Sequence, residues 1–135
     1  MNGKEMLLGL LLIFLPLSYA QAYSYCSNVP VTRVESSNGP GFHNMSELGV
    51  VGAFVFVRLD VSKCGDSEGR PFATSVFLVI DDLDNINSPN TLKKSWVSML
   101  MTAVTAGKTI NLHAANLGIN SRNTQALRPY YLTLQ

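Results

Sequence analysis

Hydrophobic and polar positions alternate with a period of two in the middle of the chain. Between residues 50 and 60 every second position is aliphatic, at Ala53, Val55, Val57 and Leu59. Because neighbouring side chains of a β-strand point to opposite faces of a sheet, this pattern predicts a strand with one aliphatic face. Residues 72–80 are apolar almost without interruption, which predicts a central strand that is buried on both faces.

Three weaker patterns predict further strands. Residues 27–36 are rich in β-branched side chains, but Pro30 has no backbone N–H, which predicts an edge strand or the start of a strand. Residues 108–114 alternate between apolar and polar side chains, and residues 128–134 predict a last strand that begins at its proline. The polar composition of residues 116–124 predicts a loop between these two strands.

The spacing of apolar residues predicts one α-helix over residues 91–106. Residues 88–90 supply capping side chains, and Gly107 stands where a left-handed residue commonly ends a helix. Val97 and Met101 widen the apolar arc to about 200°, more than one buried face requires. This width predicts a second contact surface, such as an oligomer contact, although exposed apolar residues are also common on monomers. The apolar positions of the helix are Leu92, Trp96, Met99, Leu100, Ala103 and Val104.

The beginning of the chain has the pattern of an export signal. A lysine precedes an apolar run at residues 6–15, and a proline and small residues follow it. The run is too short for a transmembrane helix, which needs about 20 residues. Cleavage after Ala22 fits the small residues, and cleavage after Ala20 fits almost as well. We expect residues 1–22 to be a signal peptide and residues 23–135 to be a single domain, secreted or periplasmic, with no membrane span.

Composition and charge limit the partners of this domain. Of the 135 residues of the whole chain 47% are hydrophobic and 14% are charged, which is typical of a packed globule and argues against a disordered chain. The formal net charge of +1 provides no basic surface of the kind that binds a polyanion. Nucleic acid is therefore not an expected partner.

The two cysteines, Cys26 and Cys64, would meet an oxidising compartment after export. One disulfide is the expectation, with two free thiols as the alternative. If loop closure in the unfolded chain accounts for the effect, such a bond stabilises the fold by about 4 kcal/mol. Neither cysteine has a second cysteine or a histidine at the spacing of a metal site.

Residues for catalysis or metal binding form no recognisable pattern. His43 and His113 fall in a loop and on the polar face of a strand, without a partner at a ligand spacing. The acidic stretch 81–87 lacks the glycine and glutamate of a calcium loop, which favours a solvated loop that ends in a helix cap. We expect no enzyme, metal or cofactor; a hydrolase built on His113 and a distant carboxylate is the alternative.

Four tyrosines lie near the two ends of the mature chain, at Tyr23, Tyr25, Tyr130 and Tyr131. Tyrosine combines a flat apolar face with a hydroxyl, a combination that suits sugar rings. The alternative is that these rings only cover an open sheet edge.

Two segments carry a resemblance to a known family, Gly52-Ala-Phe-Val-Phe-Val-Arg-Leu-Asp60 and the stretch from Trp96 to Leu112. They resemble small exported bacterial proteins that share a barrel of the OB type with the B subunits of subtilase-type and typhoid-type AB5 toxins. The resemblance implies a five-stranded antiparallel Greek-key barrel with one helix. It also implies ring pentamers, sialylated glycans as ligands and an exported catalytic subunit as a partner.

The resemblance places the sugar contacts on the first strand. In the toxin subunits an acidic residue and a serine four positions later meet the glycan, and Asn28 and Thr32 fall at those places here. Both side chains can hydrogen-bond a sugar, but Asn28 is not acidic and Thr32 carries an additional methyl group. We therefore expect an exported, non-enzymatic binding module that binds a glycan and forms a homo-oligomer. The alternative is a small exported interaction or inhibitor domain that binds another protein and no carbohydrate.

Overall fold

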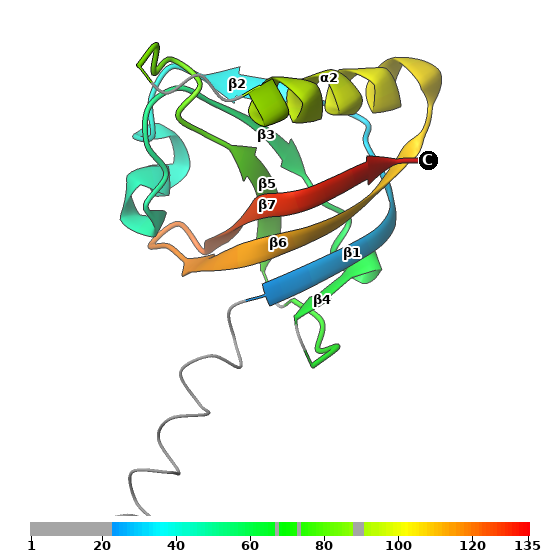
Figure 1. Ribbon diagram of the computed structural model, residues 1–135. Helices are drawn as coiled ribbons and strands as arrows, with labels where there is room; N and C mark the ends of the chain where they lie inside the picture. Colours follow the sequence, from blue (N-terminus) through cyan, green and yellow to red (C-terminus); the bar gives the residue numbers. More distant parts are fainter. Residues whose placement is uncertain (1–22, 67, 73, 88–90) are drawn as a thin grey trace, which may run out of the picture.

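The computed structural model describes residues 23–66, 68–72, 74–87 and 91–135. Its strands are β1 (Tyr23–Pro30), β2 (Glu35–Ser37), β3 (Phe54–Arg58), β4 (Cys64–Asp66), β5 (Ser75–Ile80), β6 (Thr109–Ile119) and β7 (Thr124–Leu134). The 3-10 helices η1 (Phe42–Leu48) and η2 (Val61–Lys63) and the α-helix α2 (Thr91–Ala106) complete the fold (Figure 1). The expected signal peptide, residues 1–22, and the expected helix cap at residues 88–90 lie outside the described residues.

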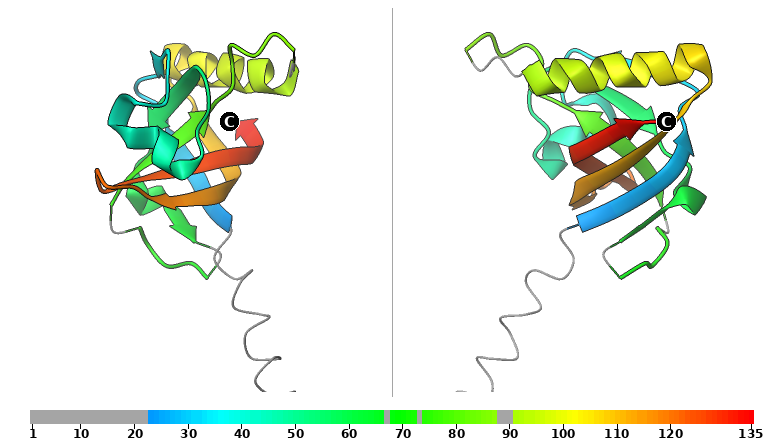
Figure 2. Two further views of the ribbon diagram at one scale, coloured as in Figure 1. Left: turned by 90° about the vertical axis from the view of Figure 1, so that its left-hand side faces the viewer. Right: turned by 45° about the vertical axis from the view of Figure 1, so that its right-hand side comes forward.

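All seven strands belong to one mixed sheet, in the order β2-β3-β5-β7-β6-β1-β4. β5 and β7 run parallel, and the other neighbours are antiparallel. β1 and β2 are five places apart in this order, yet only residues 31–34 join them. In a flat sheet that separation is about 24 Å, and so short a link reaches at most about 18 Å. The sheet must therefore curl, and it wraps round an interior (Figures 1 and 2).

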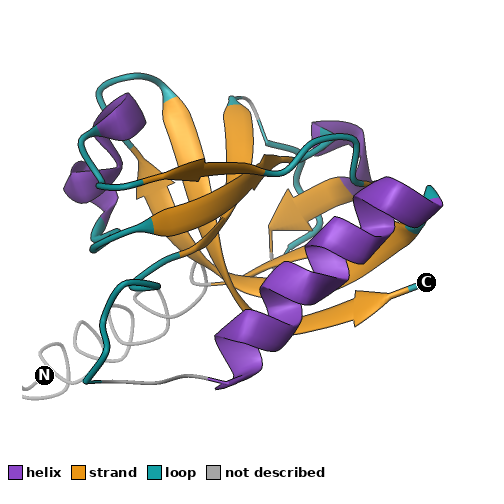
Figure 3. Ribbon diagram, turned by 90° about the horizontal axis from the view of Figure 1, so that it is seen from above, coloured by secondary structure: helices purple, strands orange, loops and turns teal. Residues whose placement is uncertain are grey.

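The interior of the curled sheet holds the larger of two apolar clusters. Inward-facing side chains of the strands meet Trp96, Leu100 and Ala103 of α2, all of them buried. The helix lies across the sheet, as the view from above shows (Figure 3), and it contacts β5, β6 and β7. The strands contribute Cys26, Val29, Val57, Val76, Leu78, Ile80, Ile110, Leu112, Ala114, Leu127 and Leu132, among others.

A second apolar cluster lies on the opposite face of β3 and β5. Phe54 and Phe56 of β3 and Phe77 of β5 pack there against Met45, which η1 supplies. Successive residues of β5 thus face the two clusters in turn, and all but the first are buried. The prediction of a central strand buried on both faces is confirmed. The cover by η1 was not expected, because residues 42–48 show little periodicity.

The predicted helix is confirmed in extent, since α2 spans Thr91–Ala106 and Gly107 adopts a left-handed φ of 63°. The two residues expected to form an oligomer contact have different surroundings. Val97 packs against the interior cluster, whereas Met101 is 50% exposed. Of this pair, only Met101 is an exposed side chain, with half of its surface open to solvent.

Two sequence predictions near the end of the chain are wrong. The segment 116–124 is not a loop throughout, because β6 continues to Ile119 and β7 already begins at Thr124. Pro129 lies within β7 and not at its start. It is tolerated there because the pairing of β6 and β7 shifts register beside it, beyond the point where β7 pairs with β5.

The broad fold expectation, mostly β with one α-helix, is confirmed. The expected five-stranded antiparallel barrel is not. The sheet has seven strands and one parallel pair, and its end strands β2 and β4 do not pair with each other in the described residues. Residues 31–34 divide the predicted first strand into two, and β4 extends the sheet beyond β1. Among the described residues, no helix is long and apolar enough to span a membrane.

The expected disulfide is present between Cys26 and Cys64. The two residues face each other in the antiparallel pairing of β1 with β4. The bond therefore ties the short end strand to its only neighbour in the sheet order. It closes a separation of 38 positions in the sequence.

Reduction of this bond should lower the melting temperature by about 10 °C or more, because the unfolded chain regains roughly 4 kcal/mol of entropy. The measurement is a thermal melt with and without reductant, with thiol titration as the control that Cys26 and Cys64 are free. Identical melts of the fully reduced and oxidised protein would contradict the stabilising role.

Candidate ligand-binding site

The four tyrosines among the described residues lie together on the outer face of β1, β6 and β7. Tyr25 of β1 pairs with His113 of β6, and His113 pairs with Tyr131 of β7. Tyr23 and Tyr130 belong to the same group. We call these five residues, Tyr23, Tyr25, His113, Tyr130 and Tyr131, the tyrosine patch.

Ring contacts connect the patch through His113. The His113 ring lies 4.7 Å from the Tyr25 ring, 5.1 Å from the Tyr131 ring and 6.1 Å from the Tyr130 ring, measured between centroids. Tyr23 joins through an edge-to-face contact with Tyr130 at 5.7 Å. Such geometry is favourable between aromatic rings and holds them in defined orientations.

An irregularity in β7 allows two consecutive tyrosines to share one face. Tyr131 pairs with His113 and Pro129 pairs with Ala114, so Tyr130 is an additional residue between the two pairs. A bulge of this kind interrupts the alternation of side chains. Pro129 and Leu132 are buried, whereas Tyr130 and Tyr131 both face outward.

The tyrosine rings remain open to solvent although they contact one another. Their exposed fractions range from 41% for Tyr25 to 49% for Tyr131. The patch lies on a face of the sheet, since β7, β6 and β1 are consecutive strands and β4 continues beyond β1. The rings therefore do more than cover a sheet edge, and they offer apolar surface beside hydroxyl groups.

The ionisation of Tyr130 is coupled to its neighbours. Burial raises the pKa of its hydroxyl above the ordinary value of 10.0. The nearby Tyr25 and Tyr23 hydroxyls raise this pKa further, because two phenolates at close range repel, and a hydrogen bond with Tyr25 adds to the effect. The patch therefore keeps the Tyr130 proton to a higher pH than an isolated tyrosine would.

The variant Tyr25→Phe should lower the pKa of Tyr130 toward its ordinary value, because it removes a phenolate and a hydrogen bond. In the unfolded chain the Tyr130 hydroxyl loses its proton near pH 10, whereas in the folded chain it keeps the proton to a higher pH. The raised pKa of Tyr130 therefore stabilises the fold below pH 10, and this stabilisation is lost as the pH rises through the folded pKa. A pH titration of tyrosine ring-carbon NMR signals measures the shift. Tyr131→Phe is the matched control, and an equal change in both variants would contradict the coupling.

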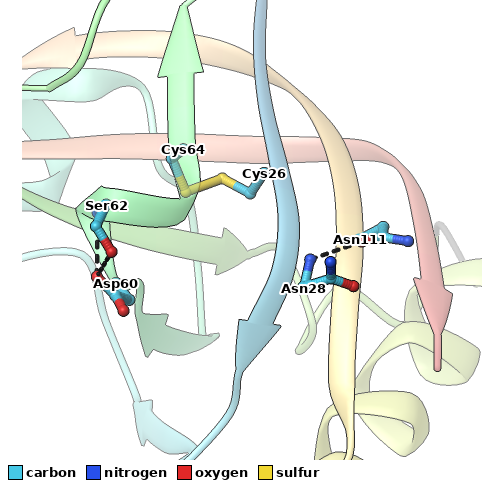
Figure 4. The surroundings of a disulfide bond; sticks show 6 residues. All are labelled: Cys26, Asn28, Asp60, Ser62, Cys64 and Asn111. Atoms are coloured by element: carbon cyan, nitrogen blue, oxygen red, sulfur yellow. Dashed lines mark hydrogen bonds between the residues drawn. A yellow bond between two sulfur atoms is a disulfide. The ribbon is translucent and has the colours of Figure 1, made fainter.

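Asn28, an expected sugar contact, lies near the patch at a second bulge. Ser27 and Asn28 together oppose Asn111 of β6, and Asn28 has a left-handed φ of 54°. Its backbone N–H donates to Oδ1 of Asn111 at 2.8 Å (Figure 4). Asn28 is exposed, and it follows Cys26 of the disulfide on the same strand. The structure thus places two amide side chains on the strands that carry Tyr25 and His113.

Thr32, the other expected sugar contact, has different surroundings. It is exposed in the link between β1 and β2, where it lines a hollow of 370 Å³ with Arg33, Glu35 and Arg58. Arg33 is paired with Glu35 at 2.7 Å. A role for Asn28 and Thr32 in sugar binding therefore remains a prediction, with Asn28 the closer of the two to the patch along β1.

The acidic stretch after β5 is partly buried, contrary to the expectation of a solvated loop. Asp81 is 2% exposed, and its carboxylate accepts hydrogen bonds from Nε and Nη2 of Arg128 at 3.1 and 2.8 Å. It also accepts a hydrogen bond from the Val51 backbone N–H at 3.0 Å. Asp84 accepts one from the Ala53 backbone N–H at 2.9 Å. These carboxylates thus anchor the segment that precedes β3.

The side chains that could bind a metal ion do not cluster in the described part of the chain. No three histidine, cysteine, aspartate or glutamate side chains gather there in a way that could hold a metal ion. His113 contacts tyrosine rings, as described above. The alternation of residues 108–114 predicts His113 on the polar face of its strand, but the bulges that bring Asn28 and Tyr130 near it leave no signal in the sequence.

Comparisons of the chain with protein-family models, with curated proteins and with solved structures found no match.

Proposed function

We propose that the chain is an exported binding module without catalytic activity, and that the tyrosine patch binds a carbohydrate. The exposed group of four tyrosines around His113 carries this proposal. Sugar rings present faces of C–H groups and edges of hydroxyls, which aromatic faces and polar side chains match in turn. The patch supplies the rings, and the tyrosine hydroxyls and the His113 nitrogens supply donors and acceptors.

We also propose that the fold is a variant of the OB barrel. β1 and β2 would then be two halves of one first strand, interrupted at residues 31–34, and β4 a short addition beside it. The other long strands are β3, β5, β6 and β7, which brings the total to five, and α2 lies between β5 and β6 in the chain. A partly open five-stranded barrel is the architecture of OB domains, which bind oligosaccharides among other ligands.

The variant Tyr131→Ala should weaken the binding of a glycan found on an array about tenfold, because it removes an exposed ring that contacts His113 at the centre of the patch. Tyr131→Phe keeps the ring and should lose less affinity. Ile86→Ala is the control, since Ile86 is 89% exposed in a loop outside the patch. A blank array, or equal affinity of the Tyr131→Ala variant, would contradict the proposal.

The same binding measurement separates the two residues that the resemblance implies. Asn28→Gly removes the amide and keeps a residue that accepts a positive φ. Thr32→Val removes the hydroxyl and keeps the shape of the side chain. If the sugar lies over the patch and reaches along β1, Asn28→Gly weakens binding and Thr32→Val has a smaller effect.

A homo-oligomer is part of the proposal, with Met101 on α2 as the contact residue. Its exposed apolar side chain would be covered in a ring of subunits, whereas Val97 already packs in the interior. An exported catalytic subunit as a further partner belongs to the same toxin-like interpretation.

Light scattering at two concentrations should give a mass near that of five subunits, and Met101→Lys should reduce it to that of a folded monomer, because a charge would have to be buried in the contact. Lys94→Gln, also an exposed position on α2, is the control. Val97→Lys is unsuitable, because it would place a charge against the core. An unchanged mass of the Met101→Lys variant would reject this interface, and a monomeric parent protein would reject the ring.

The alternative function is a protein-interaction or inhibitor domain. Exposed tyrosines favour it as well, since tyrosine is enriched in the energetically important centres of protein interfaces. The two proposals differ in what competes for the patch. If the patch binds a sugar, the protein binds a glycan on the array, and the same glycan in soluble form competes for the patch. If the patch binds a protein, the array gives no signal.

A further inference from the structure

A second hollow, which shares no residue with the tyrosine patch, opens at the ends of β3 and β5 and beside the turn between β6 and β7. Its volume is 750 Å³. Arg58 lines it from the end of β3 and Arg122 from the turn, together with Phe72 and Ser75. We call this hollow the arginine cleft.

The two arginines give the cleft more positive than negative charge. Neither Arg58 nor Arg122 forms an ion pair in the described residues, where other cations hold the salt bridges. Asp60 also lines the cleft, but its Oδ1 already accepts hydrogen bonds from the Ser62 backbone N–H at 3.0 Å and the Ser62 hydroxyl at 2.7 Å. The cleft therefore holds two guanidinium groups and one carboxylate, an excess of one positive charge.

A contact with the buried ring of Phe77 positions Arg58. The guanidinium carbon of Arg58 lies 5.2 Å from the centre of the Phe77 ring, a cation–π contact. The His43 ring, which also lines the cleft, lies edge-on to Phe77 at 5.5 Å. Phe77 itself belongs to the apolar cluster under η1. Because Arg58 is positioned before a ligand arrives, less side-chain freedom is lost when one binds.

We propose that the arginine cleft binds a small molecule that carries an oxyanion, a carboxylate or a phosphate, next to an apolar group. The planar guanidinium presents paired N–H donors that match such an anion. Phe72 offers an apolar wall, and the volume lies in the range of small-molecule sites. His43 also lines the cleft, and its Nδ1 atom is buried without a hydrogen-bond partner in the described residues.

The test is an NMR titration of the disulfide-bonded protein with glucuronate, with inorganic phosphate and with glucose, followed at the arginine side-chain N–H signals. Glucuronate, phosphate or both should bind with shifts at Arg58 and Arg122, and which of them binds identifies the oxyanion. Glucose should leave these signals unchanged. Binding should weaken as salt is added, because exposed charges are screened.

Variants test whether the anion binds in the arginine cleft. The double variant Arg58→Gln with Arg122→Gln should weaken anion binding about tenfold or more, since charge-assisted hydrogen bonds are lost. If the double variant fails to fold because Arg58 no longer contacts Phe77, the single variant Arg122→Gln provides the test. Arg122 lies in an exposed turn, and its replacement should also weaken anion binding. Lys94→Gln removes one positive charge on α2 and should have no effect. Absence of binding by both anions, glucose as effective as glucuronate, or an equal loss in Lys94→Gln would overturn the proposal, and none of these results depends on the tyrosine patch.

Discussion

The four-residue connection between β1 and β2 sets the shape on which the rest of the structure depends. It joins strands that stand five places apart in one sheet, a distance that so short a link cannot cover unless the sheet curls. Curling gives the sheet a concave face, where the larger apolar cluster forms, and a convex face toward solvent. The buried side of α2 then completes the interior with Trp96, Leu100 and Ala103.

The two halves of the convex face differ in whether another element covers them. Over β3 and β5 it carries the phenylalanine cluster, which η1 covers with Met45. Over β1, β6 and β7 the rings of the tyrosine patch keep about half of their surface exposed. An uncovered aromatic group on a small domain is uncommon enough to suggest a contact surface. The half of the convex face that lacks a cover is thus the half with the chemistry of a binding site.

Local patterns in the sequence predicted what depends on local geometry. Periodicity located α2, and the unbroken apolar run predicted that β5 is buried on both faces. The division of the first strand at residues 31–34 and the parallel pairing of β5 with β7 were not predictable, because they depend on which strands meet across the curled sheet. The same holds for the site. The sequence shows four tyrosines near its ends, but only the pairing of Tyr25 with His113, and of His113 with Tyr131, brings them together.

The tyrosine patch also depends on how firmly β1 is held. β6 pairs with one edge of this strand and β4 with the other, and the disulfide joins Cys26 to β4 one residue after Tyr25. On the far side of the patch, Tyr130 occupies its outward position only because the bulge in β7 is fixed by pairing with β6. A surface built from rings on paired strands loses little freedom when a ligand binds, unlike one carried on a loop. The covalent bond at the end of the sheet therefore holds the strand that carries Tyr23 and Tyr25 of the proposed binding surface.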